Sequence, residues 1–501
     1  MLKKKINILH VGNIANNAYL NSKFLREIGI KSDVLCYDYY HIMGCPEWED
    51  AKIIGDHGND FNPDWEKVDL NGFKRPNWFF QNSLEEIAQQ RFAIKTDFGS
   101  PYGGILLNTF SIIATGISLY QSFLYKNYLK HFYHPNKNKL KVLSWLGKII
   151  GLINGLCIRY LIWAQKQLIP KKIRDLQNRK EYQYYQELIK EFNNYFPKRK
   201  DKLKMQDIYP FLYRARIFKD IFKKYDIVQC YATDPIYAML ANKHPNIAFE
   251  HGTLRSIPFE KTAVGRLTAL AYRKADLVFI TNADNIEAAK NLGIKNFTPI
   301  PHPFNNHWHL KYKNLKKNKN IIIIFCPMRH DWSIKGIDLY ILTLPEIIAK
   351  TNKIIKVIFI EWGMDVDKSK NLIKKFHIEE NVQWLAPLPR HQFIYWLHKS
   401  DIVLDQLILP SMGGITAEAM QAGKPVLASY QHSSNKWMFP NKPPIIYTRN
   451  KEDIVRNIKH LLKNPKYANK IGKEGEEWFK KYHSKKIVTE KLIRSYEKLL
   501  K

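Results

Sequence analysis

The sequence predicts an α/β protein built from two Rossmann-like, doubly wound domains. Short apolar runs of four to six residues, bounded by small or polar residues, recur along the chain as buried parallel strands do. Helical patterns alternate with these runs, which is typical of a doubly wound fold. The alternation occurs twice, on either side of the Lys- and Asn-rich stretch 311–320, so we place the junction between the domains at about 305–320.

Composition and charge narrow the class of protein. The chain has 501 residues, of which 45% are hydrophobic and 25% are charged, so we expect a packed core and about two or three domains. This composition excludes a disordered tail, a collagen-like fibre and a polytopic membrane protein. The net charge of +33 calls for an anionic partner, which could be nucleic acid, an acidic membrane surface or a phosphorylated small molecule.

The cysteines and the N-terminus indicate a cytoplasmic protein. The five cysteines are scattered and odd in number, which argues against a disulfide framework or a zinc knuckle and fits a reducing cytosol. The first residues are basic, but no long apolar stretch follows them. They therefore predict a first strand rather than a secretion signal.

The first domain is predicted over residues 1–305. Its expected strands are Ile6–Val11, Ser32–Tyr37, Ile227–Tyr231, Ile247–Glu250 and Leu277–Ile280, with Gly12 directly after the first. The alternation is interrupted by an insertion at about 46–225, which begins as an irregular stretch rich in Trp, Asn, Asp and Pro.

Two apolar, basic helical stretches at about 98–175 are the main feature of this insertion. Residues 98–125 hold no charged residue, and 142–169 hold only three cations, with basic clusters between and after the two stretches. Small and polar residues in the first stretch and cations in the second disfavour insertion across a bilayer. Two readings remain: a helical hairpin lying on an anionic membrane surface, or a buried helical pair covering the sheet.

The second domain is predicted over residues 306–484. Its expected strands are Ile321–Phe325, Lys356–Ile360, Val382–Leu385, Ile402–Leu404 and Val426–Ala428, and a separate helix of about 485–499 occupies the C-terminal segment 485–501.

Two cations follow the first strand of this domain. Arg329 and Lys335 lie in the segment RHDWSIKG, at a carboxyl strand end where open α/β sheets bind ligands. A guanidinium fork and a point charge suit two adjacent phosphates. The alternative is a pair of solvated cations on a basic surface.

A glycine pair opens a later helix. Gly413 and Gly414 allow close backbone approach to a ligand, and the helix N-terminus after them favours an anion. Glu418, within the first turns, could accept hydrogen bonds from a ribose diol. The alternative is a plain turn followed by an acid that pairs with the helix dipole.

Three segments, taken in order, resemble the donor half of a GT-B glycosyltransferase. They are RHDW…KG, the predicted strand Val382–Leu385 with the following Ala386, Pro387 and Leu388, and GGITAEAMQAGKPV. The resemblance is to the family 4-like enzymes (glycosyltransferase group 1) of bacterial surface polysaccharide assembly, and it is strongest over residues 247–430. It implies two domains facing across a cleft. It also implies retaining sugar transfer from a nucleoside-diphosphate sugar to a glycan or polyprenyl-diphosphate-linked acceptor, without a cofactor or metal.

The resemblance also assigns residues. It implies that Arg329 and Lys335 bind the donor diphosphate and that Glu418 binds the ribose. Further donor contacts are implied for the base at Leu385, Ala386 and Pro387, for sugar and phosphate at Gly413 and Gly414, and for the diphosphate and acceptor at Gly12.

One family position differs here. The acid that contacts the transferred sugar, eight residues before Glu418, is replaced by Pro410, and Asp405 is a candidate substitute. Asp365 and Asp367 have the spacing of a metal motif, but we expect them to cap the helix starting near residue 368.

A histidine follows the Ile247–Glu250 strand. His251 resembles the histidine found in the cleft of such enzymes, and a neutral imidazole there could orient the acceptor or the sugar. A structural role is the alternative. Arg255, four residues later, could contact phosphate, whereas His302 between two prolines indicates hinge geometry.

Three other functions compete with sugar transfer. A nucleic-acid-binding protein would explain the charge, but the cations are spread over both halves and no RRM, KH or helix-turn-helix pattern is present. A catalytically degenerate scaffold would explain Pro410, and a GT-B-like epimerase or phosphorylase would need no lipid acceptor. The basic, apolar region 98–175 favours an enzyme on the inner face of the cytoplasmic membrane, with no nucleic acid as partner.

Overall fold

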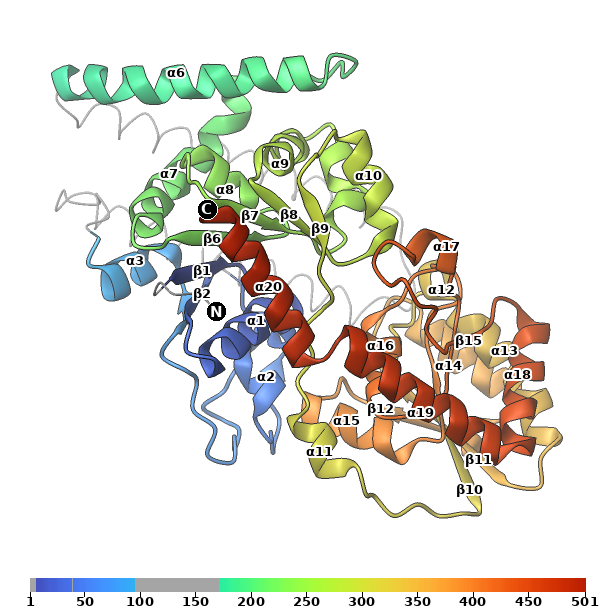
Figure 1. The fold of residues 1–501 in the computed structure, drawn as a ribbon. Helices are drawn as coiled ribbons and strands as arrows, with labels where there is room; N and C mark the ends of the chain where they lie inside the picture. The colour runs from blue at the N-terminus through green and yellow to red at the C-terminus, as the bar shows by residue number, and fades with distance from the viewer. Residues whose placement is uncertain (1–5, 38, 95–170) are drawn as a thin grey trace, which may run out of the picture. The chain divides into compact units, whose positions relative to one another are not determined.

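The computed structural model describes residues 6–37, 39–94 and 171–501 (Figure 1). The chain divides into two compact units, one formed by 1–92 with 198–501 and the other by 93–197. In the second unit the described part is mainly helix α6, Lys171–Tyr195. The predicted apolar stretches 98–125 and 142–169 lie outside the described residues.

The first sheet is parallel and has seven strands in the order β5-β2-β1-β6-β7-β8-β9. Its strands are β1 Asn7–Val11, β2 Lys31–Tyr37, β5 Phe79–Asn82, β6 Ile227–Tyr231, β7 Asn246–Phe249, β8 Leu277–Ile280 and β9 Phe297–Pro299. The order reverses direction between β1 and β6, where a doubly wound sheet opens a crevice for ligands at its carboxyl edge.

The second sheet is also parallel and has six strands in the order β12-β11-β10-β13-β14-β15. Its strands are β10 Ile321–Cys326, β11 Ile354–Ile360, β12 Val382–Leu385, β13 Ile402–Leu404, β14 Val426–Ala428 and β15 Ile446–Tyr447. Both sheets bury nearly continuous apolar runs, so the predicted class of two Rossmann-like α/β domains is confirmed.

Helices connect the strands of both sheets. Those of the first domain are α1 Asn17–Glu27, α2 Pro46–Asp50, α3 Leu84–Phe92, α7 Met205–Phe222, α8 Pro235–Leu240, α9 Ala263–Lys274 and α10 Ile286–Asn291. Those of the second are α11 His307–Tyr312, α12 Trp332–Lys335, α13 Ile337–Ala349, α14 Val366–Lys375, α15 Arg390–Lys399, α16 Gly414–Gln421, α17 His432–Asn435, α18 Lys451–Lys463 and α19 Pro465–Tyr482. The chain ends in α20, Lys485–Leu499.

The structure contains strands that the sequence did not predict. Every predicted strand is present, with ends that differ by at most two residues, but β5, β9 and β15 were missed, as were the two-residue strands β3 (Gly58–Asn59) and β4 (Asn62–Pro63), which pair with each other in antiparallel fashion. β5 is a four-residue edge strand inside a stretch rich in Trp, Asn and Pro, where turn residues hide its pattern. β9 contains Pro299, which an edge position tolerates because one side of the strand needs no partner.

The inserted unit is narrower than the predicted insertion of 46–225. The structure separates only 93–197, whereas 46–92 and 198–225 belong to the first unit. Residues 46–92 return to the sheet because β5 pairs in parallel with β2. Helix α7 belongs to the first domain as well, since Ile217, Phe218 and Ile221 are buried there.

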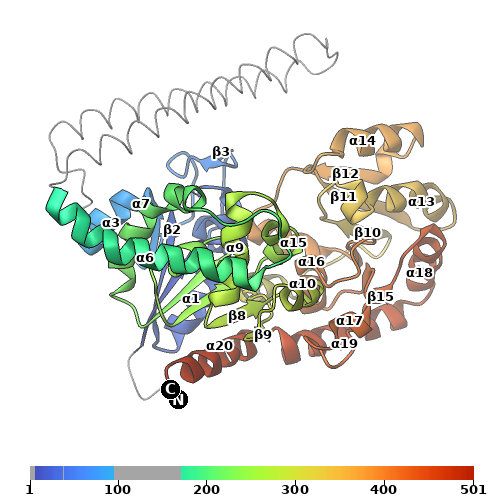
Figure 2. The same cartoon turned by 90° about the horizontal axis from the view of Figure 1, so that it is seen from above.

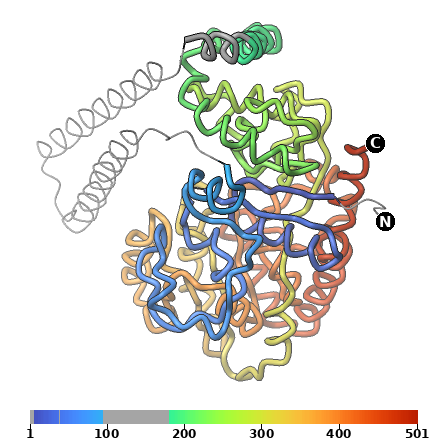
Figure 3. The backbone as a smooth tube through the Cα atoms, turned by 90° about the vertical axis from the view of Figure 1, so that its left-hand side faces the viewer, coloured from blue at the N-terminus to red at the C-terminus, as the bar shows by residue number. Residues whose placement is uncertain are grey.

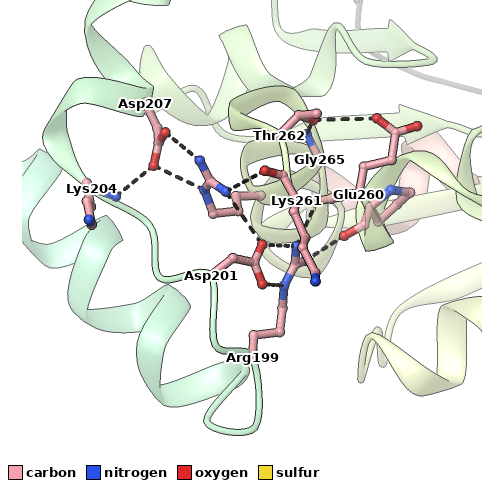
Figure 4. A network of polar contacts seen from close by, with 10 residues as sticks. Arg199, Asp201, Lys204, Asp207, Glu260, Lys261, Thr262 and Gly265 are labelled. Atoms are coloured by element: carbon pink, nitrogen blue, oxygen red, sulfur yellow. Dashed lines mark hydrogen bonds and ion pairs between the residues drawn. The ribbon is translucent and has the colours of Figure 1, made fainter.

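Charged contacts anchor the chain where it enters α7 (Figure 4). Arg199 forms an ion pair with Asp201 (2.6 Å) and donates to the Pro258 carbonyl (2.6 Å). Arg266 of α9 pairs with Asp207 of α7 at 2.6 Å. These contacts fix the start of α7 to the segment preceding α9 and to α9 itself.

Helix α20 returns from the second domain to the first. Val488, Leu492 and Tyr496 are fully buried in the same cluster as the strands β1, β2 and β6, and the Tyr496 hydroxyl donates to Gln229 Oε1 at 2.9 Å. Figure 2 shows α19 and α20 following one another, and Figure 3 shows the red end of the chain beside the blue and green strands. The predicted helix bounds are confirmed, but the sequence did not indicate its packing partner.

The part of the chain that the structure describes contains no helix that is both long enough and apolar enough to cross a membrane.

We predict that Tyr496→Ala lowers the free energy of unfolding by about 3–5 kcal/mol, because a fully buried aromatic ring is removed. Tyr467→Ala, on the more exposed face of α19, is the matched control and should cost well under about 1 kcal/mol. Urea denaturation of both variants tests the docking of α20, and equal losses would contradict it.

Candidate functional site

Arg329 and Lys335 lie at the carboxyl end of β10, as predicted. Arg329 follows the strand with its side chain 47% exposed and forms an ion pair with Asp331 at 3.3 Å. Asp331 caps the short helix α12, accepting from the Ile334 amide at 3.2 Å, and Lys335 ends that helix. The cap therefore sets where both cations emerge from the sheet.

Lys335 is held by a residue that sequence analysis did not single out. Its Nζ donates to Gln406 Oε1, and Gln406 Nε2 in turn donates to the Ser411 carbonyl at 2.8 Å. Burial lowers the pKa of Lys335, and the cations Arg329 and Arg255 lower it further. This crowding of cations is what an anion-binding site requires.

Arg255 joins this group from the first domain. It ends the short 3₁₀ helix Thr253–Arg255 after β7 and forms an ion pair with Asp284 at 2.6 Å. Because its charge acts on Lys335, the two domains contribute cations to one region. The sequence had indicated Arg255 as a phosphate contact only through its place after a strand.

Asp405 has a structural task in addition to its place at the end of β13. Its carboxylate is 1% exposed and accepts from the Thr416 amide (3.1 Å), the Thr416 hydroxyl (2.6 Å) and the Gln406 amide (2.8 Å). It thus caps α16 from outside that helix. The structure thus shows that Asp405 holds the helix N-terminus, and its contact with a sugar stays a prediction.

The turn before α16 packs closely against Asp405. A side chain at Gly413 would bring its Cβ to 3.0 Å from Asp405 Oδ2, so the carboxylate would have to shift slightly from its capping position. Gly413 also lines a small pocket between the two domains. The other residues lining this pocket are Thr281, Asn282, Ala283, His302, Phe304, Ser411, Met412, Ala417, Asn435, Met438, Phe439 and His483.

His251 lies next to this pocket. Its ring centroid is 5.6 Å from that of His302 and 5.2 Å from that of Phe249, and its Nε2 is buried without a hydrogen bond. Burial and the neighbouring His302 lower its pKa well below the usual value. This shift favours the neutral imidazole, and the contact of His251 with a sugar or acceptor stays a prediction.

Gly12 lies at the carboxyl edge of the first sheet, where the strand order reverses. Its φ is +85°, and a Cβ there would lie 2.5 Å from Asp234 Oδ2, at the end of β6. Glycine is therefore required at this position for two independent reasons. Gly12 therefore lies where the first sheet opens its crevice, and its contact with a diphosphate or acceptor stays a prediction.

Glu418, the residue predicted to bind the ribose, contacts a buried arginine. Glu418 of α16 is 6% exposed and forms hydrogen-bonded ion pairs with Arg390, at 2.8 Å through Oε1 and 2.9 Å through Oε2. Arg390 begins α15, directly after the loop holding Leu385, Ala386 and Pro387, which were predicted to frame the base. Arg390 and Glu418, 28 residues apart, thus bring the start of α15 next to α16.

Arg390 also reaches the first domain. Its Nε lies 3.2 Å from Oε2 of Glu49, on α2. Burial raises the pKa of Glu49 to about 7, and the Arg390 charge opposes this shift. Sequence analysis missed both residues, because a lone arginine after a loop and an acid within an irregular stretch carry no motif.

Asp365 precedes α14, which begins at Val366 instead of near 368, and its carboxylate makes no capping hydrogen bond to that helix, so the predicted side-chain cap is wrong. Asp365 accepts from the Trp332 amide at 2.9 Å and pairs with Lys368 at 2.7 Å, at the start of α14. Within the described ranges, no group of three or more His, Cys, Asp or Glu side chains could hold a metal ion.

Comparison with known proteins places the second domain in a family. Residues 307–478 match the family model for glycosyl transferases group 1. The match spans the second domain. The match covers Arg329, Lys335 and Glu418, so the predicted resemblance to group 1 glycosyltransferases is confirmed for the domain that carries these residues.

Solved structures of glycosyltransferases are among those similar to the chain. HepE of Anabaena in complex with UDP is 15% identical, with 57% of this chain and 82% of that chain covered and a TM-score of 0.46. A glycosyltransferase from Rickettsia africae is 16% identical, with 60% and 84% covered and a TM-score of 0.46. Sucrose-phosphate synthase of Thermosynechococcus elongatus is 16% identical, with 60% and 80% covered and a TM-score of 0.45. Among curated proteins there is no significant match.

We predict that Glu49 makes the protein less stable as the pH rises from about 4.5 to about 7. Its pKa is raised on folding, so the folded chain holds this proton more tightly than the unfolded chain and loses that advantage on ionisation. Glu49→Gln mimics the neutral acid. Its free energy of unfolding should therefore rise relative to that of the wild type across this interval, and the difference should stay constant above about pH 7.

Urea denaturation at a series of pH values measures this difference. Glu346→Gln is the control, because hydrogen bonds from Lys459 and Lys350 lower the pKa of the exposed Glu346. Its difference from the wild type should stay constant above about pH 5.5. A Glu49→Gln difference that is equally flat would contradict the prediction.

Proposed function

We propose that the protein transfers a sugar from a nucleoside-diphosphate sugar to a hydroxyl of a glycan or lipid-linked acceptor, with retention at the anomeric carbon. The observation that carries the proposal is the placement of Arg329 and Lys335 after β10, with Lys335 hydrogen-bonded to Gln406, whose neighbour Asp405 caps α16, in a domain that matches the group 1 glycosyl transferase model. The second domain would hold the donor and the first domain the acceptor.

The chemistry requires negative charge to be stabilised on the leaving group. In the proposed step the bond between the anomeric carbon and the β-phosphate oxygen breaks, and the acceptor oxygen bonds to that carbon from the same face. The acceptor proton passes to a phosphate oxygen of the departing nucleoside diphosphate. Arg329, Lys335 and the free amides at the start of α16 would stabilise the charge that develops, and such stabilisation is the largest usual source of rate enhancement.

The remaining donor contacts follow the family resemblance. Glu418 would accept from the ribose hydroxyls, and the loop 385–387 would frame the base. Gly413 and Gly414 would approach the sugar and phosphates, and Gly12 would complete the diphosphate and acceptor side. No metal ion has a part in this proposal, so EDTA should leave the transfer rate unchanged.

His251 would act as a neutral hydrogen-bonding group. Its lowered pKa keeps the ring uncharged at neutral pH, so it can donate to or accept from a sugar or acceptor hydroxyl without competing with the phosphate cations. Asp405 would act without touching the donor, by holding the N-terminus of α16 in place.

We further propose a polyprenyl-diphosphate-linked acceptor at the inner face of the cytoplasmic membrane, in cell-surface polysaccharide synthesis. The support is compositional: a net charge of +33 and the apolar, basic stretches within 98–175. Such a surface would concentrate the enzyme near an anionic, membrane-embedded acceptor.

The proposal predicts that Arg329→Ala and Lys335→Ala each lower the transfer rate by about 10²–10³-fold, because each removes charge stabilisation from the leaving group. Release of nucleoside diphosphate and transfer of labelled sugar measure the effect, after thermal-shift screening of UDP, GDP, ADP and CMP sugars for the donor. Lys350→Ala, an exposed cation at the end of α13, is the control. Unchanged transfer by a folded Arg329→Ala variant would reject the proposal.

The same experiments separate the competing functions. Nucleotide binding without transfer or hydrolysis would favour a degenerate scaffold, and conversion of the donor sugar without an acceptor would favour an epimerase. Tight, steeply salt-dependent binding of DNA or RNA would favour a nucleic-acid-binding protein.

The proposed membrane contact predicts that the protein sediments with vesicles containing phosphatidylglycerol and remains in solution with vesicles of phosphatidylcholine alone. Raising the salt concentration should release it, because the attraction is electrostatic. Equal sedimentation with both vesicles, or with neither, would contradict the electrostatic contact.

A further inference from the structure

Arg390 occupies a position that links the two domains through buried charges. Its guanidinium lies between Glu418 of the second domain and Glu49 of the first, and the side chains of both acids are at most 8% exposed. The Arg390 guanidinium is thus held by acidic side chains from both domains.

The Glu418 carboxylate can still accept further hydrogen bonds after its contact with Arg390. One guanidinium nitrogen of Arg390 contacts both oxygens, at 2.8 and 2.9 Å. A carboxylate offers about four lone-pair sites, so each oxygen retains one for another donor. A ribose diol supplies two hydroxyl donors side by side. The contact therefore fixes the carboxylate without using up its capacity for a diol.

The contact with Glu49 connects this carboxylate to the rest of the first domain. The neighbouring Asp50 accepts from Asn305 Nδ2 at 2.8 Å and pairs with Lys23 of α1 at 2.7 Å. Asn305 lies in the crossing between the domains, and its carbonyl accepts from Gln421, at the end of α16. The position of Arg390 is thus set from both domains and from the crossing between them.

We propose that Arg390 is a positioning residue for the nucleoside, which orients the Glu418 carboxylate toward the ribose hydroxyls and, through Glu49, ties that orientation to the first domain. This inference rests on the proposed function, since it assigns a role within the proposed donor site. The ligand group that it concerns is the cis-diol of a ribonucleoside diphosphate.

The experiment compares a ribonucleoside diphosphate with its 2′,3′-dideoxy form by isothermal titration calorimetry. The nucleotide used is whichever of UDP, GDP and ADP the wild type binds most tightly. Hydrogen bonds to a carboxylate contribute strongly to binding affinity. The wild type should therefore bind the ribose form about tenfold to a hundredfold more tightly than the dideoxy form. Arg390→Gln should weaken binding of the ribose form and leave binding of the dideoxy form unchanged, so the preference falls to near one.

Two further variants keep the test decisive if Arg390→Gln does not fold. Arg390→Lys keeps the charge but loses the fork that spans both acids, and should show an intermediate preference. Glu49→Gln removes only the link to the first domain, and should lower the preference by a smaller factor. Arg494→Gln, an exposed arginine of α20, is the matched control and should keep the wild-type preference.

The outcomes distinguish this inference from the proposed function. A wild type that binds no nucleoside diphosphate overturns both. A wild type that binds both forms equally overturns the role of Arg390 while leaving a diphosphate site. A full ribose preference in folded Arg390→Lys and Glu49→Gln variants likewise overturns the inference and leaves the proposed function intact.

Discussion

The buried carboxylate of Asp405 is the constraint on which the second domain's site depends. It follows β13, caps α16 through Thr416, and packs closely against Gly413. Through the amide of Gln406 it also fixes the side chain that receives Lys335. An unpaired buried carboxylate is costly, so its three hydrogen bonds keep the strand end, the glycine turn and the helix N-terminus in one arrangement.

Charge accounts for much of what surrounds this centre. Cations from both domains gather near the α16 terminus, where their mutual repulsion and the burial of Lys335 favour an anionic ligand. A second buried group links the two domains through two acids and one arginine. It consists of Glu49, Arg390 and Glu418. Positive charge thus collects where a diphosphate is proposed to bind, and carboxylates lie where a ribose would donate hydrogen bonds.

The first domain contributes geometry more than charge. Gly12 lies at the reversal of the strand order, and the neutral His251 packs against other rings beside the pocket that Gly413 also lines. Helix α20 buries Tyr496 against the same sheet, so the C-terminal segment helps to hold the two domains together. An interface made partly by the chain's own C-terminal helix limits how far the domains can separate without exposing this core.

The sequence by itself determined the two α/β domains, their long strands, the final helix and the residues Arg329, Lys335, Gly413 and Glu418, because apolar runs and motifs are local patterns along the chain. Only the tertiary structure decided that Asp405 caps a helix, that α20 packs on the first domain, and that 46–92 rejoin the sheet through β5. It also brought Arg390 and Glu49 together across 341 positions of sequence. Such partners are set by long-range packing, and a single charged residue carries no mark of which opposite charge it will meet when the chain folds.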